Sequence, residues 1–216
     1  MKIKNNVLKE KLKNVYFIAG TNCGGKSTMA KHLSKEFNMI YYSADDHYWN
    51  HRQYSDIENQ PAMNRPFTTW DEYFSRNAEK QANWLLDSEL EEMDFIILDL
   101  IELAKDKNQK VVVDIHCMPE IFKQVSTYGR VIFLLADPEL VYNEYFSRDD
   151  KSDMLKCIMK NTTNPEFSIE NTRLVSKVIA QKEIDKAIES GFLCNFRDEE
   201  TNFLERAEAV IKHFNI

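Results

Sequence analysis

The stretch Gly20–Ser27, GTNCGGKS, constrains this 216-residue chain more than any other feature, because it fits the pattern GxxxxGK[ST]. A short apolar run, residues 14–19, precedes it, and residues 26–37 follow with helix formers and apolar side chains at helical spacing. A glycine-rich loop between a buried strand and a helix arranges successive backbone amides around an anion. The context therefore predicts a phosphate-binding loop rather than a glycine-rich turn with an incidental Lys and Ser.

Each position of this loop has an expected role. Lys26 is expected to reach the terminal phosphates of a nucleotide, and the Ser27 hydroxyl to ligate magnesium. Cys23 lies beside a helix N-terminus and a lysine, so we expect a lowered thiol pKa unless the side chain turns into the core. The predicted nucleotide contacts of the loop are Gly20, Thr21, Asn22, Cys23, Gly24, Gly25, Lys26, Ser27 and Thr28.

Strand and helix patterns alternate along the rest of the chain, which predicts an α/β protein with a parallel sheet. Further short apolar runs predict strands at 39–42, 110–115, 129–136 and 192–196. Helical patterns cover 138–148, 152–161, 168–190 and 202–214.

Residues 48–108 form an insertion between the second and third predicted strands. The part from 48 to 68 is polar and aromatic, and we expect it to be irregular because Pro61 and Pro66 interrupt it. A capping box at 69–72 predicts a helix to about residue 86, and a second at 88–91 predicts another helix, or a bend in one long helix, to about 107. Residues 87–107 carry eight acidic and two basic side chains, for which a solvated face is favoured over a docking site.

Composition excludes several classes of protein. A formal charge of −7 and a pI near 5.3 argue against a nucleic-acid or membrane-surface binder. The four cysteines are widely spaced and no Cys/His pair has metal-ligand spacing, which argues against a disulfide framework or a structural zinc site. The Lys-rich start has no small-residue cleavage site, so we expect a strand at 15–19 and not a signal peptide. We expect one domain, 1–216, in a cytoplasmic protein that is a monomer or homodimer.

Carboxylates follow two of the predicted strands. Asp45 and Asp46 come directly after the second strand, and Asp114 lies at the end of the third, with His116 two residues on. Open α/β sheets place ligands at this carboxyl edge. Asp114 is expected to act on magnesium, directly or through its water shell, and the alternative is a turn former. His116 either contacts substrate or is satisfied locally.

The loop and its surroundings resemble the P-loop kinases of small metabolites and nucleosides, a group that includes shikimate, uridine, nicotinamide riboside and nucleoside monophosphate kinases. The resemblance covers about 14–47 and 110–216, and it does not extend to the insertion. It implies a five-stranded parallel sheet in the order 2-3-1-4-5, with helices on both faces. It also implies that Asp45, with Asp46 as its neighbour, activates an acceptor hydroxyl; the alternative for this pair is to cap the following turn.

The same resemblance implies a lid at about 145–160. Its basic side chains, Arg148 with Lys151 and Lys156, would close over the phosphates. The segment 195–198 would border the adenine, with Phe196 or Arg197 stacked on it. In the insertion, the aromatic side chains are expected to form a small core that packs onto the sheet.

These features together predict an ATP- and magnesium-dependent kinase that phosphorylates a hydroxyl of a small molecule such as a nucleoside, a sugar-like metabolite or an antibiotic. Arg52 and Arg65 would suit an anionic acceptor, whereas acidic residues such as Asp56 and Glu58 would suit a cationic one. The alternatives are a nucleotide-dependent switch with a protein partner and a polynucleotide 5′-end kinase. The acidic balance disfavours the latter, and no NKxD motif supports the former.

Overall fold

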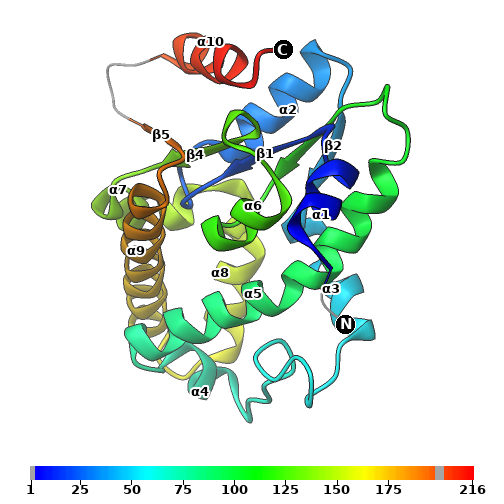
Figure 1. Cartoon of the computed structure of the whole chain (residues 1–216). Coiled ribbons are helices and arrows are strands. Elements are labelled where there is room, and N and C mark those ends of the chain that lie inside the picture. Colours follow the sequence, from blue (N-terminus) through cyan, green and yellow to red (C-terminus); the bar gives the residue numbers. More distant parts are fainter. Residues whose placement is uncertain (1–2, 198–201) are drawn as a thin grey trace.

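The computed structural model describes residues 3–197 and 202–216 (Figure 1). Its centre is a five-stranded parallel sheet in the order β2-β3-β1-β4-β5, which confirms the predicted α/β class and strand order. The strands are β1 (Val15–Ala19), β2 (Ile40–Ser43), β3 (Val111–Asp114), β4 (Val131–Leu135) and β5 (Leu193–Phe196).

The central strands are apolar throughout because helices cover both faces of the sheet. Every residue of β1, β3 and β4 is buried. The register pairs Asp114 at the end of β3 with Ile18 on one side and with Ser43 on the other. Because all strands run the same way, the segments that follow β1, β2 and β3 leave the sheet at one edge. This edge carries the phosphate loop, Asp45 and His116.

Two groups of helices cover the sheet (Figure 1). On one face, α2 (Lys26–Glu36) and α10 (Phe203–Phe214) bury Leu33 and Phe214 with the sheet residue Ile18. On the other face, the core around Phe17 contains residues of α5 (Ala78–Leu103), α6 (Pro119–Val125) and α9 (Pro165–Ser190). Leu8 of α1 (Asn5–Lys11) packs against the same core. Sequence patterns did not predict α1 or α6.

The insertion differs from expectation in two places. Residues 44–54, most of which we expected to be irregular, form the helix α3 (Ala44–Tyr54). The break between helices falls at 75–77, between α4 (Trp70–Phe74) and α5, and α5 continues through Ser88. Ser88 is buried and its hydroxyl hydrogen-bonds the Tyr48 hydroxyl at 3.0 Å. The second predicted capping box was therefore wrong. At the first, the Thr69 side chain accepts the Glu72 amide as predicted, while the Glu72 carboxylate accepts the amide of Thr68 instead of Thr69.

The acidic stretch of α5 also differs from a solvated face, because four of its carboxylates point into the protein. Glu91 accepts the backbone amides of Ala62 and Met63. Glu92 and Asp99 contact the two ring nitrogens of His51 of α3, at 2.7 and 2.9 Å, and His51 is only 5% exposed. The fourth, Glu89, faces His116. The solvated-face prediction was wrong for this side of the helix.

The helix α7 (Pro138–Glu144), which Asp137 caps, directly precedes the segment expected to form the lid. The described residues also form the helix α8 (Ser152–Asn161) and three short 3-10 helices, which are Tyr128–Arg130, Tyr145–Ser147 and Asp149–Lys151. Within residues 3–197 and 202–216, no helix combines the length and the apolar character needed to cross a membrane.

Candidate active site

The phosphate loop is packed tightly on the end of β4. A Cβ built on Gly20 would lie 2.1 Å from the carbonyl oxygen of Leu134, and one on Gly24 would lie 2.2 Å from the same atom. Gly20 and Gly25 also have positive φ angles, 124° and 89°. The close approach to Leu134 therefore requires glycine at positions 20 and 24, and the positive φ favours it at position 25.

The loop ends at the N-terminus of α2. Among the described residues, no side chain caps this helix, so the amides of its first turn are available to an anion. The Thr21 hydroxyl accepts the amide of Ala136 at 2.8 Å, and the Thr21 carbonyl accepts the Lys26 ammonium at 2.9 Å. Thr21 therefore positions the loop and Lys26, and its own side chain is fully buried.

Three arginines bind consecutive residues of the loop from outside. Arg148 Nη1 donates to Asn22 Oδ1 at 2.9 Å, and Arg197 Nη1 donates to the Cys23 carbonyl at 3.0 Å. Arg206 Nη2 donates to the Gly24 carbonyl at 2.9 Å. The first two were predicted nucleotide contacts, and the third, on α10, was not predicted. Their positive charge surrounds the place where phosphate would lie.

A cavity of about 360 Å³ adjoins the loop on the α10 side. Its lining residues come from the loop, from α2, from the end of β5 and from α10: Cys23, Gly25, Thr28, Met29, Arg197, Phe203 and Arg206. This is the position expected for a nucleotide base, with Phe203 as the aromatic lining residue. Phe196, one of the two predicted stacking residues, does not line the cavity, and Asp198 lies outside the described residues.

Cys23 does not have the thiol environment that we expected. Burial raises the pKa of the thiol, and the nearby Arg148 only partly opposes this. The predicted lowering was wrong, because the desolvation of a half-buried thiol outweighs the positive charges around it. The backbone of Cys23 has a φ of 59°, which turns its carbonyl to Arg197.

Asp45 and Asp46 lie in the first turn of α3, at the carboxyl end of β2. Asp45 Oδ1 is 3.1 Å from Nε2 of His116. This hydrogen bond and the charge of His116, with smaller effects of Lys26 and Lys151, hold the pKa of Asp45 well below its usual range. Both carboxylates are exposed, but the charge of Asp46 acts on the Tyr41 phenol. Of the two, Asp45 is the carboxylate that lies among the site's cations.

His116 is held between carboxylates. Its Nδ1 lies 3.4 Å from Glu89 Oε1 of α5, while its Nε2 faces Asp45. Burial alone would lower the pKa of His116, but the charges of Glu89 and Asp45 raise it to about 10. His116 is therefore charged at neutral pH, and it keeps Asp45 ionised.

The two predicted magnesium ligands lie at the same edge of the sheet. Ser27 is in the first turn of α2, and Asp114 ends β3 with 8% of its surface exposed. The Tyr41 hydroxyl makes a long contact with Asp114 Oδ2, 3.5 Å. A hydroxyl and a carboxylate are hard oxygen donors of the kind that magnesium prefers, so the donor set fits this ion.

The cations of the expected lid are not equivalent. Nε and Nη2 of Arg148 both donate to Asp150 at 2.9 Å, and Lys151 Nζ lies 3.3 Å from the same carboxylate. Lys156, in contrast, is exposed and pairs with Asp153. Arg148 and Lys151 therefore lie at the phosphate loop, and Lys156 does not join them.

The insertion uses its arginines and aromatic rings for packing. The Arg52 guanidinium lies 5.4 Å from the Trp49 ring centroid, and that of Arg65 lies 5.7 Å from Trp84. Tyr73 contacts several of the other rings, so an aromatic cluster is present; its rings are Phe67, Trp70, Tyr73, Phe74 and Trp84. The helix α4, which carries three of them, packs on α8 and α9 and not on the sheet as expected.

Sequence reasoning missed Glu89 and Glu183 as residues of this edge. Each lies beside the apolar stripe of its helix: Glu183 is buried and precedes Ala187 by four residues on α9, and Glu89 is half-buried and follows Leu86 by three residues on α5. A carboxylate on the apolar stripe of an amphipathic helix is the signal that marks both.

The sheet order, the phosphate loop and the cations around it define a P-loop kinase-type protein. The Zeta toxin family model matches residues 1–131, which is more than half of the chain. The chain belongs to the Zeta toxin family. Among solved structures it is similar to dephospho-CoA kinase from Campylobacter jejuni, with 15% identity, 94% of this chain and 96% of that chain covered, and a TM-score of 0.41. No curated protein sequence matches significantly.

Proposed function

We propose that the protein transfers the γ-phosphate of ATP to a hydroxyl of a small molecule, with magnesium as cofactor. The observation that carries this proposal is the position of Asp45. An ionised carboxylate, held by His116, lies at the sheet edge that also carries the phosphate loop, and the charges of Lys26 and Lys151 act on it. A nucleotide switch has no need of such a carboxylate, whereas an acceptor hydroxyl needs a group that orients it and takes its proton.

In the proposed reaction, each residue acts at a stated place. The amides of the loop and Lys26 bind the phosphates, and the base occupies the cavity beside Arg197 and Phe203. Asp45 accepts the proton of the acceptor hydroxyl. At the same time the hydroxyl oxygen forms a bond to the γ-phosphorus, and the bond from that phosphorus to the β,γ-bridging oxygen breaks, so that ADP leaves. Arg148 and Lys151 neutralise charge that develops on the transferred group.

Ser27 and Asp114 would hold magnesium, which would supply charge neutralisation at the phosphates. The strongly lowered pKa of Asp45 makes it a weak base. In a loose phosphoryl-transfer transition state the hydroxyl proton leaves late, so orientation matters more than basicity. The acceptor would bind between Asp45 and the insertion, 48–108, and we place the reaction in the cytoplasm.

The test is an ATP turnover assay with a panel of nucleosides, sugars and aminoglycosides, with mass spectrometry of the acceptor. We expect slow basal hydrolysis, strong stimulation by one acceptor class, and an acceptor that is heavier by one phosphoryl group. Asp45→Asn should remove transfer. Hydrolysis that no acceptor stimulates and that Asp45→Asn leaves unchanged would favour the switch instead.

The family is named for a toxin, which suggests a second readout. If phosphorylation of the acceptor harms the cell, induction of the wild-type chain in a bacterial host should slow growth, and induction of Lys26→Ala at the same level should not. Equal growth inhibition by both chains would separate toxicity from phosphoryl transfer.

A further inference from the structure

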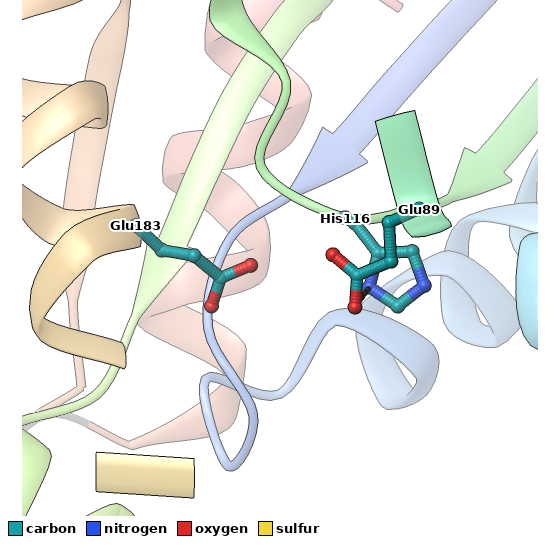
Figure 2. A group of neighbouring side chains, drawn as sticks. All are labelled: Glu89, His116 and Glu183. Atoms are coloured by element: carbon teal, nitrogen blue, oxygen red, sulfur yellow. Dashed lines mark ion pairs between the residues drawn. The ribbon is translucent and has the colours of Figure 1, made fainter. Parts of the chain in front are cut away.

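Three side chains that are distant in sequence converge beside Asp45. Glu89 comes from α5, His116 from the segment after β3, and Glu183 from α9 (Figure 2). One ligand atom of each, a carboxylate oxygen or a ring nitrogen, lies within 4.8 Å of the other two. Figure 2 shows the carboxylate of Glu183 facing Glu89 and His116, which lie together on the opposite side.

The carboxylate of Glu183 is weakly hydrogen-bonded within the described part of the chain. Glu183 is only 3% exposed, and its one hydrogen bond among the described residues is a long one, 3.4 Å, from the Cys117 amide to Oε1. Glu89 Oε2 is also buried, and no donor among the described residues reaches it. A buried carboxylate oxygen without a donor is costly, so a cation between these groups would satisfy Glu89 Oε2 and would give Glu183 a stronger partner than the Cys117 amide.

His116 is oriented for coordination by its other nitrogen. Nε2 faces Asp45 Oδ1 at 3.1 Å, which leaves Nδ1 on the side of Glu89. A histidine that donates one ring N–H to a carboxylate and offers the other nitrogen to a metal is the usual arrangement at metal sites, because the carboxylate fixes the tautomer and ring orientation.

We propose that Glu89, His116 and Glu183 bind a transition-metal dication of the zinc class, separate from the magnesium expected at Ser27 and Asp114. One imidazole and two carboxylates suit zinc, whereas magnesium prefers oxygen donors alone. Metal–ligand bonds of about 2.0–2.2 Å place two ligand atoms of a tetrahedral zinc ion about 3.3–3.6 Å apart. The three side chains would therefore have to move by up to about 1 Å to close the site around the ion.

Binding of the ion replaces the proton on Nδ1 of His116, which is released to solvent. The positive charges of Lys26 and Lys186 also act on these carboxylates, so direct coordination has to hold the ion against them. The bound ion would connect α5, α9 and the end of β3. This predicts that the ion raises the thermal stability of the whole chain, since the unfolded chain has no such site.

The experiment is equilibrium dialysis of chelator-treated, nucleotide-free protein against zinc chloride, with thermal melts in parallel. We expect one zinc ion per chain and a higher melting temperature, with no competition from an equal concentration of magnesium chloride. Glu183→Gln and Glu89→Gln should each weaken zinc binding by at least about tenfold. The matched controls are Glu189→Gln, an exposed carboxylate of the same α9, and Ser27→Ala, and both should bind as the wild type does.

A second measurement does not depend on the folding of any variant. Cobalt in place of zinc in the wild-type protein should give a spectrum of nitrogen and oxygen ligands without a thiolate charge-transfer band. No zinc binding, a thiolate band from the cysteines, or unchanged affinity in a folded Glu183→Gln chain would each overturn the site. None of these readouts requires kinase activity, so the site and the proposed function can fail separately.

Discussion

Arg148 donates to the Asn22 side chain and to both oxygens of Asp150 at the same time, each at 2.9 Å. The expected lid therefore already contacts the phosphate loop, and a carboxylate of the lid occupies the guanidinium that would meet phosphate. Lys151 contacts the same carboxylate. Asp150 would thus compete with the phosphates of the proposed nucleotide for two cations.

Asp150→Asn should strengthen nucleotide binding, because the neutral amide competes less for Arg148 and Lys151. The pair is partly exposed, so the gain should be modest, about two- to fivefold in Kd. Titration of ATP into the wild-type and variant proteins measures it. Asp153→Asn, which frees the exposed Lys156, is the control and should leave the affinity unchanged. Weaker ATP binding by Asp150→Asn would show that Asp150 organises the lid rather than competing with phosphate.

Lys26→Ala should abolish most phosphoryl transfer while the chain stays folded. The Lys26 ammonium bonds the Thr21 carbonyl and takes no part in the core. Loss of a transition-state cation costs on the order of a hundredfold or more in rate. Rates and circular dichroism of Lys26→Ala and of Lys35→Ala, an exposed lysine of the same helix, are the measurements. Near-normal rates in a folded Lys26→Ala chain would contradict the assignment of the loop.

Asp45→Asn should reduce turnover by about a hundredfold or more and leave ATP affinity nearly unchanged. The amide keeps the shape but cannot take a proton. Asp46→Asn is the matched control and should have a small effect, because the carboxylate that contacts His116 is that of Asp45. Because the pKa of Asp45 is far below its usual range, protonation of Asp45 should cause no fall in the pH–activity profile at mildly acid pH. A larger loss in Asp46→Asn would exchange the two roles.

Stability should depend on pH through His116. Its pKa is raised from 6.5 to about 10, so the folded state binds the proton more tightly than the unfolded state. This contribution is fully present below pH 6.5 and is lost as the pH rises toward 10. Urea unfolding of metal-free wild-type and His116→Gln proteins across this window should show a difference that shrinks with rising pH. A difference that stays constant would mean that His116 is not charged in the folded state.

The sequence was sufficient for the sheet and the phosphate loop because both depend on local signals. Continuous apolar runs mark strands that are covered on both faces, and the spacing of glycines with Lys26 and Ser27 marks the loop. Local signals also misled. Ser88-Glu89-Leu90-Glu91 has the form of a capping box, but the Ser88 hydroxyl bonds Tyr48 from another helix, so no helix begins there. Tertiary contacts decided that position, and propensity did not.

The carboxylates of the site were hidden for the same reason. Glu89 and Glu183 are 94 residues apart in number, and only the packing of α5 against α9 and the end of β3 brings them to His116. The direction of the Cys23 pKa shift could not be predicted from the motif, because it depends on how deeply the thiol is buried in the folded chain. What remains a prediction is the chemistry itself: the nucleotide, magnesium and the acceptor.

His51 contacts Glu92 and Asp99 of α5, and it lies two turns beyond Asp45 on α3. The helix that carries the proposed base is thereby fastened to the longest helix of the insertion. Acceptor preference and turnover should then depend on the same contact, because a change on α5 that reshapes the acceptor side would also move Asp45 relative to the phosphate loop. Variants selected for a new acceptor should need compensating substitutions along the α3–α5 contact before their turnover rate returns to that of the wild type.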